Sequence, residues 1–298
     1  MLPGKVPPEI LESHVFKHLG KSHPDLILGP SLGQDASVIR FGDRVLIAST
    51  DPITGSVEDI GWLAVHINAN DIATFGVQPI WFLNSIMLPV GSTPSDLEYI
   101  MTQIHEAASS LNITVAGGHT EVTGDIDKPI IAGFMLGETS PGQYVTSSGA
   151  KAGDSIILTK SIAIEGTAIL ASEGRSYLTS KLGSMIVDSA IALRDSISVV
   201  REGVASFNTG HITAMHDPTE GGISNGIHEL CNASGVGFRI IHEAIPVHHS
   251  TKDICDFLGV NPLNLISSGC MLMTCHTDNS EEVMRILKEI DIEASVIG

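Results

Sequence analysis

Four acidic segments in the first half of the chain carry residue types that bind metal ions. They end expected strands or lie in helices and loops: Gly33-Gln34-Asp35, Ser49-Thr50-Asp51, Asn70-Asp71 and Gly117-Gly118-His119-Thr120-Glu121. Mg²⁺ prefers carboxylate oxygens and usually binds through one or two of them together with substrate phosphates. A single Asp of this kind is more often only a turn cap. Four acidic segments gathered in one cleft would repel one another without a cation, so together they favour a metal-assisted phosphate site.

The phosphate-binding loops of the commonest nucleotide folds do not occur in this sequence. Neither Gly-x-x-x-x-Gly-Lys-Ser/Thr nor Gly-x-Gly-x-x-Gly is found. The pair Gly117-Gly118, which follows an expected strand, would let backbone N–H groups approach an anion. Such a pair is as often only a bulge or a turn. Any phosphates must therefore be held in another way.

The most specific pattern of the second half is MHDPTEGGISNGIHEL, residues 215–230. A strand ending in His216 and Asp217 leads through Pro218 and a Gly-Gly pair into a helix, whose N-terminus favours negative charge. This order predicts that Asp217 lies at the edge of a cleft. His216 is a candidate general acid or base. The alternative is a hydrogen-bonded structural histidine, which is common at strand ends.

Alternating strands and helices must position these residues. In the first half we expect a hairpin over 36–50 around Gly42-Asp43, helices over 60–75 and 94–111, and strands over 80–88, 113–122 (broken at Gly117-Gly118) and 129–139. In the second half we expect strands over 155–160, 212–216 and 236–241, helices over 165–173, 184–200 and 222–233, and a final strand–helix–strand. This order predicts an α+β or α/β fold.

The length of 298 residues suits two domains, and a turn-rich stretch near 145–153 lies between the two halves. We expect an N-terminal arm over 1–30, a first domain over 31–148 and a second over 149–298. The 43% hydrophobic content is enough for two buried cores. Disorder and a fibrous structure are therefore disfavoured.

Charge and cysteine usage limit the partners and the compartment. There are 16 Lys and Arg against 34 Asp and Glu, a net charge of −18, which argues against nucleic acid and anionic membranes. The four cysteines fall in the last quarter without a Cys-x-x-Cys pair, which disfavours a zinc site. No secretion leader is recognisable, and no apolar run approaches the ~18 residues of a membrane helix. We expect a reduced, soluble, cytoplasmic protein.

Six segments in unbroken order resemble the superfamily of aminoimidazole ribonucleotide (AIR) synthetase, PurM. They are GQDASVI, STDPITG, NANDIATFGVQP, GGHTEV, AGDSIILTKSIAIEGTAILA and HDPTEGGISNGIHEL. The superfamily also includes the hydrogenase maturation factor HypE, thiamine-monophosphate kinase and selenophosphate synthetase. The segments IEGTAILA, HDPTEGG and IPV…CDFLGVNPLNLISSG are most similar to HypE and the AIR-synthase-related proteins grouped with it. The resemblance covers about residues 30–298.

The resemblance implies a PurM-like α+β fold of two domains, with N-terminal sheets that pair into a barrel across a homodimer and a C-terminal α/β sandwich. ATP with Mg²⁺ would lie in the cleft between the halves. By position, the resemblance implies Asp35, Asp51, Asp71 and Asp217 as metal and phosphate residues, Asn70 beside them, and Gly117, Gly118 and Thr120 as a turn around the phosphates. The shared chemistry is phosphoryl transfer from ATP, in most branches onto an amide-type oxygen.

Three departures from the family pattern change these expectations. His119 stands where several branches have an acidic residue, so Glu121 is the alternative metal ligand. Glu220 stands where HypE-like sequences commonly have Arg, which removes a positive charge near the phosphates. HypE carries its substrate on a C-terminal Cys, whereas this sequence ends EASVIG and its last cysteine is Cys275. Either the sequence lacks its end, or the acceptor is a separate small molecule or partner protein.

The leading hypothesis is an ATP- and Mg²⁺-dependent enzyme that phosphorylates an amide-like oxygen, in hydrogenase maturation or in purine-synthesis-like chemistry. The alternatives are a catalytically silent, nucleotide-binding scaffold in hydrogenase maturation, a thiamine-monophosphate-kinase-like phosphotransferase, and a structural dimer without a ligand. The kinase is disfavoured by its different second-half motif, and selenophosphate synthetase by the lack of an N-terminal Cys. The identity of the acceptor is not encoded in any readable motif.

Overall fold

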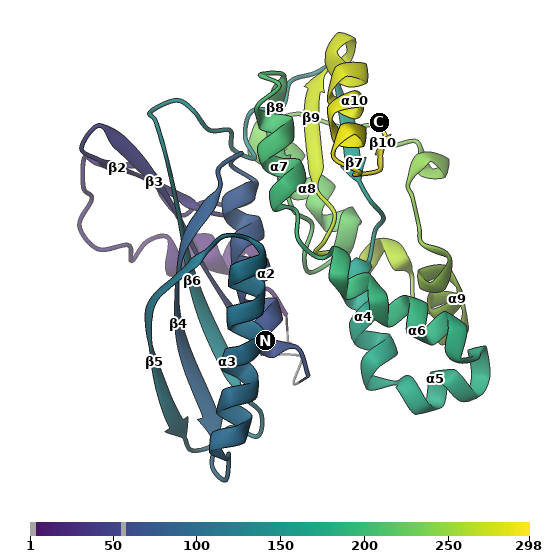
Figure 1. Ribbon diagram of the computed structural model, residues 1–298. Coiled ribbons are helices and arrows are strands. Elements are labelled where there is room, and N and C mark those ends of the chain that lie inside the picture. The colour runs from purple at the N-terminus through teal and green to yellow at the C-terminus, as the bar shows by residue number, and fades with distance from the viewer. Residues whose placement is uncertain (1–3, 55–57) are drawn as a thin grey trace.

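Two β-sheets, one in each half of the chain, form the framework of the protein (Figure 1). The computed structural model describes residues 4–54 and 58–298. The first sheet has the order β1 (Leu26–Leu28), β2 (Ser37–Phe41), β3 (Arg44–Ile53), β6 (Ile130–Thr139), β4 (Pro79–Pro89) and β5 (Thr114–Thr123). Its pairs are antiparallel except β4 with β5. The helices α2 (Ile60–Ala73) and α3 (Pro94–Ser110) cover one face, and Figure 1 shows no helix on the other.

Local sequence rules explain most of this first half. The predicted hairpin is confirmed, because Phe41 of β2 pairs with Arg44 of β3 around the Gly42-Asp43 turn. The expected start of α3 is also confirmed by a capping box: the Thr93 hydroxyl accepts from the Asp96 N–H, and the Asp96 carboxylate accepts from the Thr93 N–H. Helix α2 is buried on nearly every side, because it lies between the first sheet and the second half of the chain.

The second sheet is antiparallel throughout and has the order β10 (Ala294–Val296), β7 (Asp154–Thr159), β9 (Leu272–His276) and β8 (Ile212–His216). Beside it lie α7 (Val200–Phe207), α8 (Gly222–Ser234) and α10 (Ser280–Glu289), as Figure 1 shows. A separate group of helices packs around its own small apolar core: α4 (Ile164–Glu173), α5 (Arg175–Leu182), α6 (Ser184–Ala192) and α9 (His249–Leu258). The expected α+β class is confirmed. Among the described residues, no helix is long and apolar enough to cross a membrane.

Three expected elements are wrong in detail. The helix expected over 184–200 is divided into α6, the 3₁₀ turn η2 (Leu193–Ser196) and α7, because the side chain of Asn70 binds the backbone groups of Ile197 and Val199. The strand expected over 236–241 is irregular, and its apolar Phe238 and Ile241 are exposed. Strand β5 does not break at Gly117-Gly118. It continues with a register shift, and a Cβ on Gly118 would lie 2.4 Å from the Asn84 carbonyl oxygen of β4.

The two halves share one apolar core. Residues of the first sheet and α2 pack in the same buried cluster as five residues of the second half. These are Ile197, Val199 and Val200, where η2 leads into α7, and Met215 and Met271. The relative placement of the halves is therefore fixed by burial as well as by the chain connection. The four cysteines are buried and unpaired.

Candidate functional site

A pocket of about 550 Å³ lies between the two halves and collects the acidic residues that the sequence singled out. Asp35, Asp51 and Asp71 reach it from the first half, and Asp217 reaches it from the second. Of the described residues that line it, Lys5 alone carries a fixed positive charge. The pocket is therefore strongly electronegative.

The first half positions its three carboxylates on one strand-to-helix unit. Asp35 precedes β2, Asp51 lies near the end of β3, and Asp71 lies in α2. Asn68, one turn before Asp71, holds the backbone of Asp51: its Oδ1 accepts from the Asp51 N–H at 2.9 Å, and its Nδ2 donates to the Asp51 carbonyl at 3.2 Å. The side chain of Asn68 thus fixes the spacing between Asp51 and Asp71. Sequence reasoning missed this role, although Asn68 stands in the quoted segment NANDIATFGVQP.

Burial and mutual repulsion disfavour the charged forms of these acids. Burial, with help from Glu220 and Asp35, raises the pKa of Asp51 to about 6. Burial and the carboxylates of Asp51, Asp217 and Asp35 raise the pKa of Asp71 well above its usual range. The charged forms of carboxylates in such surroundings are stabilised when a multivalent cation binds between them.

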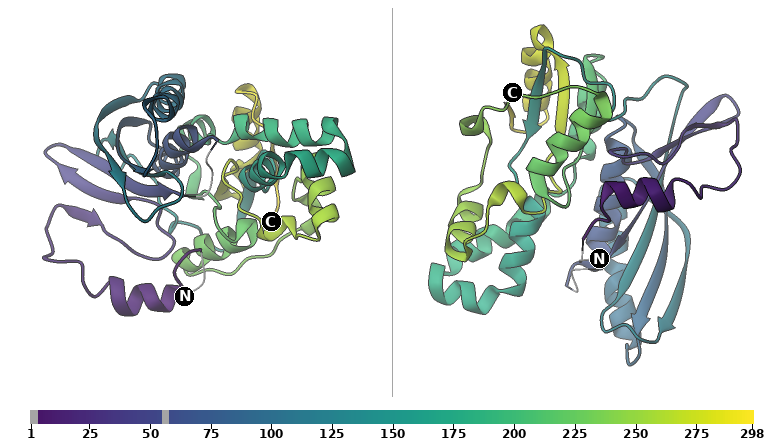
Figure 2. Two further views of the ribbon diagram at one scale, coloured as in Figure 1. Left: turned by 90° about the horizontal axis from the view of Figure 1, so that it is seen from below. Right: turned by 180° about the vertical axis from the view of Figure 1, so that it is seen from behind.

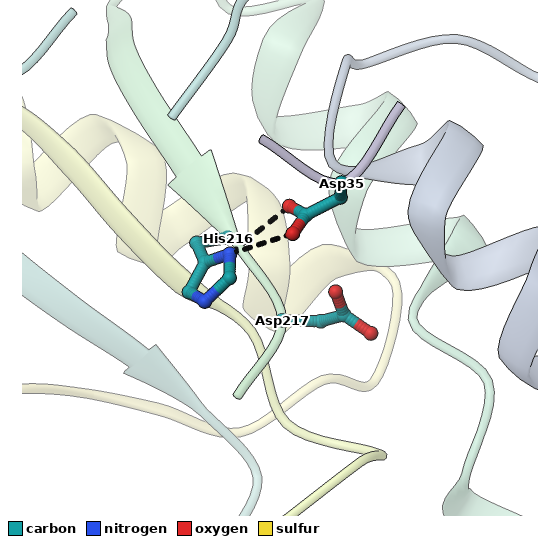
Figure 3. A group of neighbouring side chains, drawn as sticks. All are labelled: Asp35, His216 and Asp217. Atoms are coloured by element: carbon teal, nitrogen blue, oxygen red, sulfur yellow. Dashed lines mark hydrogen bonds and ion pairs between the residues drawn. The ribbon is translucent and has the colours of Figure 1, made fainter. Parts of the chain in front are cut away.

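His216 sits at the end of β8, where Figure 3 shows its ring beside Asp35. Its Nδ1 lies 2.9 Å from Asp35 Oδ1, and its Nε2 lies 3.0 Å from Glu229 Oε2 of α8. Burial alone would lower the pKa of His216, but the Asp35 and Glu229 carboxylates raise it to about 10. A protonated imidazole donates to both neighbours. Both ring nitrogens are engaged, so the geometry favours a positioning role over general base catalysis.

The turn from β8 to α8 places Asp217 beside this histidine. Gly222 has a φ of 64°, and a Cβ there would lie 2.5 Å from the Leu263 carbonyl oxygen, so the turn requires glycine. Asp217 is 1% exposed, and its Oδ2 is buried without a hydrogen-bond partner among the described residues. Burial and the nearby Asp35 raise the pKa of Asp217 well above its usual range. Such an orphaned oxygen is typical of a site that completes its contacts with a ligand.

The N-terminal arm contributes a cation that sequence reasoning missed. Lys5 Nζ lies 3.5 Å from Glu229 Oε1 and 3.9 Å from Glu220 Oε2 at the pocket. The arm from residue 4 onward lies beside the second half of the molecule, as Figure 2 shows. Lys5 faces Glu220, which stands where HypE-like sequences commonly have Arg. Lys5 therefore brings a positive charge close to the position at which that Arg is absent. The arm segment containing Lys5 carries no pattern that would have indicated this contact.

Glu165 of α4 is a second missed residue. It is 7% exposed, and burial raises the pKa of its carboxyl to about 7, although the neighbouring Ser268 side chain acts in the opposite direction. Its backbone is held, since its N–H donates to the Ser268 carbonyl at 3.2 Å. A lone Glu in the apolar segment SIAIEGTAILA was the available signal, because an unpaired acid is rare in a buried helix.

Other predicted site residues do not line this pocket within one copy of the chain. Asn70 is buried and binds the backbone of the second half rather than facing the pocket. Gly117, Gly118, Thr120 and Glu121 form no turn: they lie in the exposed strand β5, three strands from β3 and thus about 14 Å away. The Glu121 carboxylate accepts from Thr123 and contacts His119. A phosphate or metal role for these β5 residues stays a prediction and requires a second copy of the chain.

The donor set of the pocket fits Mg²⁺. Asp51, Asp71 and Asp217 offer hard carboxylate oxygens, and Asp217 Oδ2 makes no hydrogen bond with the described residues that would compete with a cation. Asp35, His216 and Asp217 also lie close enough to form a metal group. The ion pairs of His216 make it a poor ligand, because a metal would have to displace its proton. The carboxylates are therefore the better candidates.

Two sheet-bearing halves around a pocket of carboxylates define the PurM-like two-domain fold. The chain belongs to the AIR synthase-related family. The N-terminal-domain model of that family matches residues 33–139, and its C-terminal-domain model matches residues 151–298. The family predicted from the sequence motifs is thus confirmed.

Similar proteins come from hydrogenase maturation. A putative hydrogenase expression/formation protein of Methanocaldococcus jannaschii is 29% identical over 99% of this chain and 88% of its own length. The carbamoyl dehydratase HypE of Azotobacter vinelandii is 31% identical over 80% of this chain and 69% of its own. Among solved structures, HypE in a HypE–HypF complex has a TM-score of 0.79 and 24% identity over 97% of this chain and 92% of that one. HypE in complex with ATP has a TM-score of 0.74 and 23% identity over 99% and 86%.

Proposed function

We propose that this protein is a cytoplasmic, ATP- and Mg²⁺-dependent enzyme that phosphorylates the oxygen of a carboxamide in hydrogenase maturation. The observation that carries this proposal is the pocket in which Asp35, Asp51, Asp71 and Asp217 converge around a single lysine. Relatives named carbamoyl dehydratase and a structural relative in complex with ATP support it.

Within the proposal, each pocket residue has a task. Asp51, Asp71 and Asp217 would hold Mg²⁺, which when bound neutralises the phosphates of ATP and withdraws charge from the transferred group. Asp35 is oriented by His216, which Glu229 fixes from the opposite side. Phosphoryl transfer needs mostly positioning and charge stabilisation, which a rigid carboxylate cluster supplies. Direct proton transfer by His216 or Asp217 stays a prediction.

Calorimetric titration with ATP tests the proposal directly. We expect binding in excess Mg²⁺ and its loss in excess EDTA, because the pocket repels unaccompanied phosphates. We also expect ADP release that depends on an added carboxamide, with benzamide as the first probe. ATP binding that is equally tight in EDTA would contradict the metal-dependent site, and an absence of ATP binding in both conditions would overturn the proposal.

A silent nucleotide-binding scaffold is the second candidate. It is favoured by Glu220, which adds a negative charge to the phosphate pocket and pairs with Lys5 at 3.9 Å. Binding of MgATP without ADP release, across a series of carboxamides and thiamine monophosphate, would support the scaffold. ADP release with any of these acceptors would exclude it.

The uncovered face of the first sheet supports the proposed homodimer. All residues of 114–122 in β5 are exposed, Val122 by 61%, and Phe134 of β6 is 46% exposed. We expect light scattering to give twice the mass of one chain, and Val122→Lys to shift the mass toward a single chain. A single-chain mass for the unmodified protein at all concentrations would contradict the dimer. The HypE–HypF complex supports a maturation partner, which co-elution with a HypF relative would test.

A further inference from the structure

A groove of about 1230 Å³ runs along a different face of α2 from the carboxylate pocket. Trp62 and His66, one turn apart on α2, line the groove, whereas Leu63, Ile67 and Asp71 of the same helix line the carboxylate pocket. No described residue lines both spaces. The groove is therefore a separate site, and α2 separates it from the carboxylates.

His66 is a buried polar residue of this groove without hydrogen bonds. It is 3% exposed, and neither Nδ1 nor Nε2 has a hydrogen-bond partner among the described residues. Its ring lies against the indole of Trp62, with ring centroids 4.2 Å apart, and the Trp62 Nε1–H is likewise buried without a partner in the described part of the chain. Buried polar groups without partners are costly and rare. Two neighbouring side chains thus present three nitrogen atoms to a ligand.

The imidazole of His66 is neutral at pH 7. Burial, together with the ammonium group of Lys160, lowers the pKa of His66 to about 4. A neutral imidazole donates from one ring nitrogen and accepts at the other. With the indole N–H of Trp62, the pair of rings therefore offers two donors and one acceptor.

The charges of Lys160 and Glu202 at the groove compensate each other. Lys160 Nζ donates to the carbonyl oxygens of Ser196 and Ser198 at 2.8 and 2.7 Å, and it lies 2.7 Å from Glu202 Oε1. These three contacts use all the hydrogens of the ammonium group. Glu202 is buried, and its Oε2 has no hydrogen-bond partner among the residues that the structure describes. This ion pair therefore leaves one further acceptor and no net charge.

The exposed part of the groove is mainly acidic. Asp195, Asp291 and Glu293 line it and are exposed. Apart from Lys160, Arg201 is the one Lys or Arg among the described lining residues, and its guanidinium donates to a backbone carbonyl at 2.7 Å. Like charges repel, so a ligand that carries phosphate is disfavoured here.

We propose that this groove binds a neutral nitrogen heterocycle of the nucleobase type, as a free base or a nucleoside, against Trp62 and His66. The edge of a nucleobase carries neighbouring donors and acceptors, which match the unpaired groups of His66, Trp62 and Glu202. Proteins that bind unpaired bases stack them on aromatic side chains, and the indole of Trp62 offers such a surface. This inference goes beyond the proposed function, because it concerns a second ligand at a site away from the carboxylates.

Binding requires a local movement of Trp62. The nitrogens of His66 are buried, and the indole of Trp62 lies against the imidazole. The ligand reaches these nitrogens when the indole turns aside, and the indole then covers the flat face of the base. The chain has two tryptophans, so a Trp81→Phe background leaves Trp62 as the fluorescent reporter. We expect adenosine to change this fluorescence saturably.

Equilibrium dialysis with radiolabelled adenosine tests the site directly. We expect saturable binding that saturating MgATP does not change, because the two ligands would occupy different faces of α2. AMP should bind more weakly than adenosine, because its phosphate meets Asp291 and Glu293. Adenosine binding that MgATP abolishes would overturn the separate site and assign adenosine to the carboxylate pocket. Tighter binding of AMP, or no binding of adenosine, would also overturn the proposal.

His66→Leu tests the residue on which the inference depends. We expect the affinity for adenosine to fall at least about 10-fold, because the ligand loses its partners on the imidazole. The melting temperature should not fall, because neither ring nitrogen bonds to the described part of the fold. Trp62→Phe, which keeps an aromatic ring and removes the N–H, is the second variant and should also weaken adenosine binding. His105→Leu, exposed on α3, is the matched control and should leave the affinity unchanged. Unchanged affinity in Trp62→Phe and in folded His66→Leu would contradict the proposal.

Discussion

Replacing Asp71 by asparagine is expected to abolish Mg²⁺-dependent nucleotide binding and, at the same time, to stabilise the ligand-free protein. Asp71 is buried, and burial together with the carboxylates of Asp51, Asp217 and Asp35 raises its pKa well above the usual range. A pKa raised in the folded state means that the charged form is disfavoured there relative to the unfolded chain, so Asp71 destabilises the ligand-free fold at neutral pH. Asparagine keeps the shape and removes the charge. The free energy of unfolding should therefore rise.

The nucleotide affinity should change in the opposite direction. Loss of groups that merely support metal ligands typically weakens metal affinity 10–100-fold, so loss of a ligand should weaken MgATP binding by at least about 100-fold. Calorimetric titration and urea unfolding of the same Asp71→Asn preparation measure the two effects. Asp43→Asn, in the exposed hairpin turn, is the matched control and should change neither quantity. MgATP binding within about 3-fold of the unmodified protein would contradict the assignment of Asp71.

This pair of opposite effects identifies a functional carboxylate. A structural Asp that caps a turn or forms an ion pair stabilises the fold, so its removal lowers stability. A carboxylate held near others without enough cations lowers stability until its ligand arrives. The sequence left open for each acidic residue whether it caps a turn or binds a ligand. The sign of the change in the free energy of unfolding, when the carboxylate is removed, distinguishes the two.

Sequence reasoning succeeded where neighbouring residues decide the structure. The Gly42-Asp43 turn and the Thr93–Asp96 capping box specify a hairpin and a helix start within four residues. The carboxylates that line the pocket were singled out by the same logic, because Asp35 and Asp217 stand next to strand ends, and their role stays a prediction. Strand ends and helix termini at the boundary of two halves lie close together. Acidic residues at these points therefore predict a shared pocket even when the packing is not known.

The missed features depend on contacts between distant parts of the chain. The helix is interrupted before α7 because the side chain of Asn70 binds Ile197 and Val199, which lie 127 and 129 positions further along the chain. No pattern in 184–200 predicts this interruption. Lys5 reaches Glu229 across 224 positions. The β5 residues were expected around phosphates because a Gly-Gly pair suggests a turn. In the structure the pair lets β5 lie close to β4 in a parallel ladder, which periodicity alone does not distinguish from a loop.

Asn70 shows how such a long-range contact changes the meaning of a motif residue. The family pattern groups Asn70 with Asp71, yet successive helix positions point in different directions. Asn70 Nδ2 donates to the Ile197 carbonyl at 2.9 Å, and Asn70 Oδ1 accepts from the Val199 N–H at 2.9 Å. The amide thus replaces two backbone bonds that a continuous helix would have made. It ties α2, which carries Asp71, to the short segment between η2 and α7 in the second half.

Asn70→Ala is therefore expected to destabilise the whole protein, because it leaves a buried N–H and a buried carbonyl unpaired. The free energy of unfolding should fall by about 2–4 kcal/mol, since each unpaired buried group costs about 1–3 kcal/mol. For a chain of this size the melting temperature should fall by about 5–12 °C. Asn208→Ala, at the exposed end of α7, is the control and should change stability by less than about 0.5 kcal/mol. If Asn70 instead served only as a nucleotide ligand, its removal would leave the ligand-free melting temperature unchanged and weaken MgATP binding alone. A melting temperature lowered without ligand, in contrast to the rise expected for Asp71→Asn, would show that adjacent residues of one motif serve the fold and the site separately.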